Sequence, residues 1–163
     1  MLGDVEGSMT APSPLDARRF FAGRWTGQGE LLPRGPARLV LRRAPVALEG
    51  RGEWLSESVW RVHERFTLPG FAFERHMFME QVAPGLVHAS ADDMPLGADV
   101  ELDANGFRFR RFRSWLRWRG VRIRLGCASA TRAAPDGTLH AEVRLDLSRL
   151  PVATLRLAIR VER

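Results

Sequence analysis

Residues Phe107 to Gly126 read FRFRRFRSWLRWRGVRIRLG, and this stretch decides the fold. Apolar and cationic side chains alternate along it with a period of two residues, which is typical of strands with one buried and one solvated face. Gly120 can adopt a positive φ, so Arg119-Gly120 predicts a tight hairpin turn. The inner-face pairs that this turn sets are Trp118 with Val121, Leu116 with Ile123 and Ser114 with Leu125. The stretch therefore predicts two antiparallel strands between a core and a cationic exterior.

Strand signals recur along the rest of the chain, separated by turns of Gly, Pro, Asn and Asp. The further strands are expected over residues 24–32, 37–43, 52–62, 71–82, 86–91, 98–103, 138–147 and 152–161. No helix of ordinary length is expected between them, so neighbours in sequence should be neighbours in space. An open sheet of about ten strands is unusually large, and closure into a barrel removes its exposed edges. The sequence predicts an all-β, single antiparallel up-and-down barrel of about eight to ten strands.

The chain divides into a short leader and one domain. Residues 1–12 lack periodicity and are expected to be a flexible leader, followed by one barrel domain over residues 13–163. Ser13 can cap a short N-terminal helix, and Pro14 suits its first turn. Phe20 and Phe21 would then close one end of the barrel.

Two further turns set the register of the strands. Asn105-Gly106 is predicted as a two-residue loop that sets Leu102 opposite Phe109. A bulge near Arg110-Arg111 would then bring the following apolar residues inward. The three-residue loop 135–137 sets Cys127 opposite Leu145 and Ser129 opposite Val143.

Composition limits the possible partners and the compartment. The net charge is +6 and the pI is about 11.3, but all 25 basic residues are Arg, as a GC-rich genome would impose through codon choice. Arginine in place of lysine is therefore no sign of phosphate recognition. Cys127 is the only cysteine, and no apolar segment indicates a signal peptide or a membrane span. We expect a soluble, cytoplasmic protein.

Two segments resemble known families. Gly23 and Trp25 carry the Gly-x-Trp spacing that resembles the opening of lipocalin-like barrels. The segment Ala91-Asp92-Asp93-Met94 through Gly97, together with Gly106 and the final strands, resembles an uncharacterised family of bacterial lipocalin-like barrels, many of them predicted lipoproteins. The lipobox cysteine of those relatives is missing here, so their anchor is not carried over. The resemblance implies a lipocalin-like (calycin) fold and supplies no reaction.

A weaker similarity is to the ten-stranded haem-binding barrels related to nitrobindin, which also begin with a Gly-x-Trp-x-Gly strand. Their iron ligand is a histidine on the last strands. The corresponding stretch here, residues 150–156, contains no histidine. A haem-binding barrel is therefore kept only as an alternative.

The interior of such a barrel is the predicted binding site, because a closed barrel of about eight to ten strands encloses more space than side chains fill. The predicted ligand-binding residues are Trp25, Trp54, Trp60, Met77, Phe112, Ser114, Trp118 and Ser129. The leading hypothesis is non-enzymatic binding of a small, mostly apolar ligand such as a fatty acid, a lipid or an isoprenoid, with no cofactor. One alternative is an enzyme of the same fold with Asp92, Asp93 or His88 as acid or base. Another is a structural barrel without a ligand.

Two other groups of residues are candidate sites. The histidines His63, His76, His88 and His140 are scattered and match no metal-binding spacing, so no metal site is predicted. The outer face of the hairpin carries Arg113, Trp115, Arg117, Arg122 and Arg124. It could touch an anionic membrane, or it could be a solvated strand face. Nucleic-acid binding is not expected.

Overall fold

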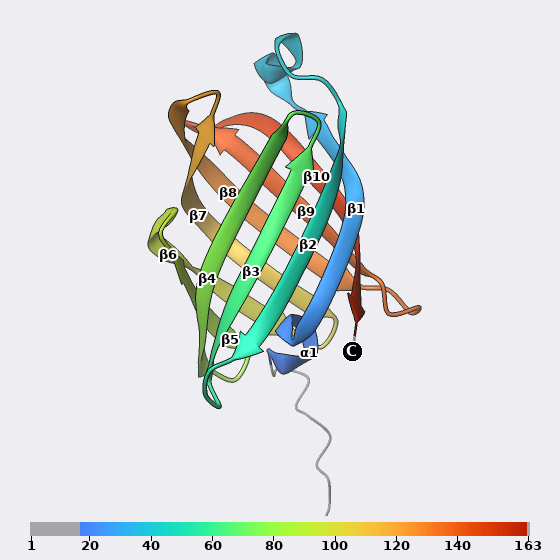
Figure 1. The fold of residues 1–163 in the computed structure, drawn as a ribbon, viewed down its shortest axis with the longest axis vertical. Coiled ribbons are helices and arrows are strands. Elements are labelled where there is room, and N and C mark those ends of the chain that lie inside the picture. Colours follow the sequence, from blue (N-terminus) through green and yellow to red (C-terminus); the bar gives the residue numbers. More distant parts are fainter. Residues whose placement is uncertain (1–16, 163) are drawn as a thin grey trace, which may run out of the picture.

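The computed structural model describes residues 17–162 and consists of one closed barrel of antiparallel strands (Figure 1). The elements are α1 (Arg18–Phe21), β1 (Gly23–Pro33), η1 (Gly35–Leu39), β2 (Ala44–Trp54), β3 (Val59–Leu68), β4 (Phe71–Ala83), β5 (Leu86–Ala91), β6 (Met94–Asp103), β7 (Gly106–Trp118), β8 (Val121–Ala133), β9 (Leu139–Leu147) and β10 (Leu150–Glu162). Each strand pairs with its sequence neighbours, and β1 pairs with β10 to close the ring. The predicted lipocalin-like up-and-down barrel is confirmed. Among the described residues, no helix is long and apolar enough to cross a membrane.

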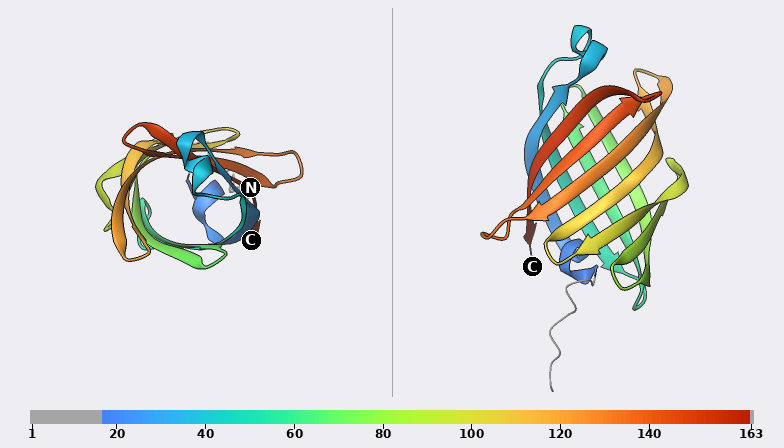
Figure 2. Two further views of the ribbon diagram at one scale, coloured as in Figure 1. Left: turned by 90° about the horizontal axis from the view of Figure 1, so that it is seen from above. Right: turned by 180° about the vertical axis from the view of Figure 1, so that it is seen from behind.

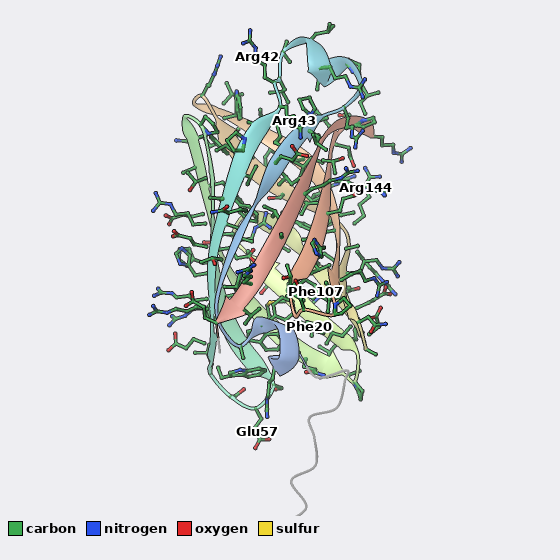
Figure 3. All side chains as sticks on the ribbon, turned by 90° about the vertical axis from the view of Figure 1, so that its right-hand side faces the viewer. Phe20, Arg42, Arg43, Glu57, Phe107 and Arg144 are labelled. Carbon is green, nitrogen blue, oxygen red and sulfur yellow. The ribbon has the colours of Figure 1, made fainter. Side chains whose placement is uncertain are left out.

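The helix α1 closes one end of the barrel (Figures 1 and 2). Phe20 and Phe21 are buried, and their rings lie 5.4 and 4.6 Å from the ring of Phe107 on β7 (Figure 3). We call this the closed end and the opposite end, near η1, the open end. The predicted leader, Ser13 and Pro14 lie outside the described residues.

The hairpin of β7 and β8 has the predicted register. Arg119 and Gly120 have φ values of 46° and 81°, as a tight two-residue turn requires. Trp118 pairs with Val121, and the register shifts between Phe109 and Phe112, which confirms the bulge. On the next pair of strands, Cys127 lies opposite Leu145 as predicted.

The turn between β6 and β7 lies one residue earlier than predicted. Leu102 pairs with Phe107 and not with Phe109, so Ala104 and Asn105 form the turn. The backbone N–H of Asn105 donates to Asp103 Oδ1 over 2.8 Å, which fixes the turn at this point. Gly106 is the first residue of β7. It lies so close to β8 that an added Cβ would overlap the carbonyl oxygen of Thr131.

Two predicted strands were wrong. Residues 37–43 do not form a strand, because Pro36 at the start of η1 begins a 3-10 turn. The strand that pairs with β1 is β2, which starts only after this segment. Residues 52–62 are not one strand but the end of β2 and the start of β3. The turn between them is closed by backbone N–H groups of Leu55 and Ser56 that donate to the carbonyl oxygen of Val59.

Candidate functional site

The inner face of the barrel changes from packed to open along the barrel axis. Toward the closed end the inward side chains are fully buried, among them Trp60, Val62, Met77 and Met79. Toward the open end several apolar inward side chains are only partly buried, although Val46 and Leu48 on β2 are buried. The partly buried ones include Leu31, Phe66, Phe73, Leu116, Leu125 and Leu155. The inner face is therefore less completely buried toward the open end, and we call this part the open half of the lumen.

Ionisable side chains meet at the floor of the open half. Glu64 on β3 lies directly opposite Arg75 on β4, and both alternate with inward apolar residues. Arg75 Nε donates to Asp93 Oδ2 over 3.0 Å, and Nη2 of the same guanidinium lies 2.8 Å from Oδ2 in an ion pair. Ser114 on β7 accepts from Arg75 Nη2 over 2.9 Å and donates to Asp93 Oδ2 over 2.6 Å. We call Glu64, Arg75, Asp93 and Ser114 the lumen cluster.

The ion pair within the lumen cluster is largely withdrawn from water. The Arg75 and Asp93 side chains are only 12% and 18% exposed. The Arg75 guanidinium carbon lies 5.1 Å from the ring of Phe73 and 5.6 Å from that of Phe112, so aromatic faces flank the cation. Burying such a pair gains little stability over an apolar filling of the same volume. Ionisable groups kept in an apolar lumen are therefore candidates for a functional role.

Glu64 is held beside the ion pair by an indole. Gly50 lies opposite both Trp25 and Glu64 on the neighbouring strands, and its missing side chain leaves room for the Trp25 ring. The indole N–H of Trp25 donates to the Glu64 carboxyl group. Burial raises the pKa of Glu64, and the nearby Arg75 opposes that rise only in part. The carboxyl group therefore holds a proton more readily than an exposed glutamate does, and in the protonated form it can donate a hydrogen bond.

The raised pKa of Glu64 makes stability depend on pH. The folded protein keeps the proton between the ordinary pKa of 4.5 and the raised value, whereas the unfolded chain loses it. The free energy of unfolding should therefore fall as pH rises through this window, by about 1.4 kcal/mol for each pKa unit. We expect Glu64→Gln to remove this fall and to unfold later than the wild type at neutral pH in urea titrations. Glu53 is the control, because the hydrogen bond from Arg61 lowers the pKa of Glu53 instead of raising it. Glu53→Gln should therefore give no gain in the free energy of unfolding at neutral pH.

The structure divides the predicted ligand-binding residues between the two ends. Trp25, Trp60 and Met77 are buried in the packed part, and the ring of Trp54 packs tilted against that of Trp60, with centroids 4.7 Å apart. The remaining predicted residues, Phe112, Ser114, Trp118 and Ser129, face the lumen. Trp118 lies nearer the open end than Ser114, whereas Phe112 and the partly buried Ser129 lie nearer the closed end along their strands. Glu64 and Arg75 were not predicted.

The three candidate acid–base residues are not brought together. Asp93 enters the lumen, whereas its neighbour Asp92 is exposed in the turn between β5 and β6. His88 is exposed on the outer face of β5, where Nδ1 lies 3.1 Å from Asp99 Oδ1. Cys127 faces the lumen, but burial raises the pKa of its thiol to about 11, so it stays protonated.

All four histidines belong to the described residues and lie on outward positions of their strands. The lumen therefore offers no imidazole to a haem iron. His63 and His76 stack across β3 and β4 with ring centroids 4.2 Å apart, and Glu74 lies beside them, 3.5 Å from His63. The second Glu74 oxygen lies 3.6 Å from Arg65. Arg51 on β2 lies directly opposite His63 in the strand register. This positive surrounding disfavours a cation at the histidine pair.

The cationic outer face of the β7–β8 hairpin partly satisfies itself. The guanidinium carbon of Arg122 lies 4.3 Å from the ring of Trp115, and that of Arg124 lies 6.0 Å away on the same ring. Trp115 is only partly exposed. These stacked side chains are typical of a solvated strand face, and a membrane contact here stays a hypothesis.

Two solved structures share this fold at low sequence identity. The S-type phycobiliprotein lyase CPES from Guillardia theta superposes with a TM-score of 0.58 and 8% identity, over 90% of this chain and 89% of that one. Rv2717c from M. tuberculosis superposes with a TM-score of 0.51 and 12% identity, over 98% of this chain and 100% of that one. No protein-family model and no curated protein sequence match the chain. The likeness supports the lipocalin-like fold alone.

Proposed function

We propose that the protein binds one small, mostly apolar molecule in the open half of the lumen, with a polar end against the lumen cluster. The observation that carries the proposal is that Glu64, Arg75 and Asp93 meet on the inner face of the barrel, among inward side chains that are otherwise apolar and partly buried. Apolar walls reward burial by about 25 cal/mol per Å² and specify little else. The lumen cluster would supply the specificity.

The cluster favours a neutral oxygen over an anion at the polar end of the ligand. The charge of Arg75 is already balanced by Asp93, so a carboxylate ligand would add an unpaired negative charge. The neutral carboxyl group of Glu64 can donate to a hydroxyl, ester or ketone oxygen. Among the predicted classes, isoprenoid or fatty alcohols and their esters fit this arrangement better than free fatty acids.

A pair of matched variants tests where the ligand binds. Ser129 and Ala130 are neighbours on β8 that point to opposite faces, Ser129 inward and Ala130 outward. We expect a neutral, environment-sensitive fluorophore to bind the wild type and Ala130→Trp saturably and with equal affinity. Ser129→Trp should fill the lumen and weaken binding at least about tenfold, because the apolar area that the probe buries is lost. Equal binding by both variants would place the probe outside the barrel.

A second titration tests the polar end. We expect a long-chain alcohol to displace the fluorophore about tenfold more effectively than the fatty acid of the same length at neutral pH. The alcohol gains a hydrogen bond from the cluster, whereas the carboxylate buries a charge without a partner. Glu64→Gln keeps an N–H donor and should preserve this preference, whereas Glu64→Leu should abolish it. A preference for the acid in the wild type would show that Arg75 binds an anion.

One observation favours an alternative, an enzyme acting on the same ligand. Asp93 and Glu64 place two carboxyl groups in different environments on the inner face of the barrel. The similar barrel from Guillardia theta is a lyase, so the fold is compatible with an activity. Conversion of a bound alcohol or ester, lost in Glu64→Gln with binding retained, would identify an enzyme.

A further inference from the structure

The open end of the barrel differs in charge from the closed end. Five connections point toward the open end, and four of them, residues 34–43, 69–70, 119–120 and 148–149, contain no acidic residue. The fifth, residues 92–93 between the short strand β5 and β6, holds Asp92 and Asp93 and lies lower on the barrel (Figure 1). The first four contain six arginines: Arg34, Arg38, Arg42, Arg43, Arg119 and Arg149. The connections at the closed end, residues 55–58, 84–85, 104–105 and 134–138, contain no arginine and two acidic residues, Glu57 and Asp136; the arginines at this end are those of α1, Arg18 and Arg19. Figure 3 shows Arg42 and Arg43 at one end and Glu57 at the other.

Aliphatic side chains stand out from the same connections. Leu39 and Val40 follow one another in and after η1 and are 89% and 82% exposed. No residue of η1 is buried, so this segment projects from the barrel (Figure 1). Three more exposed aliphatic residues flank the neighbouring turns: Val121, Leu147 and Leu150. We call these five residues and the six arginines the rim.

The rim arginines are mostly not neutralised by the protein itself. Arg43 pairs with Glu30 on β1. Arg34 Nε donates to Thr154 Oγ1 over 3.3 Å, and Arg38 Nε donates to the carbonyl oxygen of Pro33 over 3.4 Å. Within residues 17–162, the rim arginines other than Arg43 have no carboxylate within ion-pair distance. The rim thus combines free positive charge with exposed hydrocarbon.

We propose that the rim docks the open end of the barrel onto an anionic lipid surface. Arginines near such a surface gain electrostatic attraction, and exposed aliphatic side chains can enter the boundary between headgroups and acyl chains. A nucleic-acid surface would use the charge but would leave the aliphatic side chains without partners, because bases are gripped by aromatic stacking. The rim also surrounds the open end of the lumen. Docking rests on these loops alone and does not depend on the proposed ligand.

Flotation with lipid vesicles tests this docking. We expect the wild-type protein to bind phosphatidylcholine vesicles that contain phosphatidylserine, and to bind pure phosphatidylcholine vesicles at least about tenfold more weakly. Raised salt should weaken the binding, because the contact is partly electrostatic. Arg38→Glu/Arg42→Glu and Leu39→Ser/Val40→Ser should each weaken binding to the anionic vesicles at least about tenfold.

Two control variants separate this rim from other surfaces. Leu55→Ser/Val82→Ser removes exposed aliphatic residues near the closed end, and Arg117→Glu/Arg122→Glu reverses the outer face of the β7–β8 hairpin. Both should bind as the wild type does. Absence of wild-type binding, or an equal loss in either control, would overturn the proposal, as would competition by single-stranded oligonucleotides for the same arginines. Circular dichroism of every variant shows whether the barrel is intact, and lumen binding of the neutral fluorophore in the rim variants keeps the two proposals separate.

Discussion

Asp93→Ala should destabilise the barrel by about 3 kcal/mol, because it leaves the Arg75 guanidinium buried without its partner. Both Arg75 donors that reach Asp93 would lose their acceptor, and only Ser114 would remain within hydrogen-bonding distance. The backbone hydrogen bond from Trp115 to the carbonyl oxygen of residue 93 survives the substitution, so the loss reports on the carboxylate. The measurement is the free energy of unfolding from urea titrations.

The adjacent Asp92 provides the matched control. Asp92 is exposed in the same turn, so Asp92→Ala should change the free energy of unfolding by less than about 0.5 kcal/mol. The double variant Arg75→Met/Asp93→Ala should recover much of the loss, since it removes the unpaired charge. If Asp93→Ala is as mild as Asp92→Ala, the ion pair is not buried as described.

Gly29→Ala should be similarly damaging for a steric reason. Gly29 lies at the seam where β1 meets β10, and an added Cβ would overlap the carbonyl oxygen of Arg156 and approach the Leu157 Cα to 2.9 Å. These are backbone atoms, which cannot move aside as a side-chain end can. The seam would have to spread, and we expect a cost of about 3 kcal/mol, the upper part of the range for overpacking. Thermal and urea unfolding would both report it.

Gly137→Ala separates this steric effect from backbone strain. Gly137 has a φ of 83° and nothing within 4 Å of the added Cβ, so only the left-handed backbone conformation opposes the alanine. That cost is about 1 to 2 kcal/mol. Equal destabilisation by the two substitutions would contradict the close approach of β1 and β10.

The sequence was sufficient for the local features of the barrel. Alternation around Arg119-Gly120 predicts the β7–β8 register, because a period of two and a glycine turn leave one way to keep the apolar face inside. Strand prediction failed at residues 37–43, where the aliphatic run Leu39 to Leu41 lies between arginines. There the aliphatic run belongs to a projecting segment with no neighbouring strand to pair with. An apolar run alone cannot report whether a partner strand exists.

The lumen cluster escaped sequence reasoning for a different reason. Glu64 and Arg75 each occupy an inward position in an apolar alternation, and an isolated charged residue there resembles an interruption of the pattern. Their meaning depends on Asp93, which reaches them from the turn between β5 and β6. Asp93 itself was a candidate, but only the fold shows that it faces a buried cation and that Asp92 does not. The signal to look for is a pair of opposite charges at inward positions of adjacent strands.

Native mass spectrometry of the protein purified from its own cells tests the central claim most directly. We expect one adduct per chain in the wild type and in Ala130→Trp, and none in Ser129→Trp. Extraction should yield a mostly apolar molecule with a neutral oxygen function. An adduct that persists in Ser129→Trp, or a wild type that carries none and shows no saturable binding of the neutral fluorophore, would contradict a ligand site in the open half of the lumen.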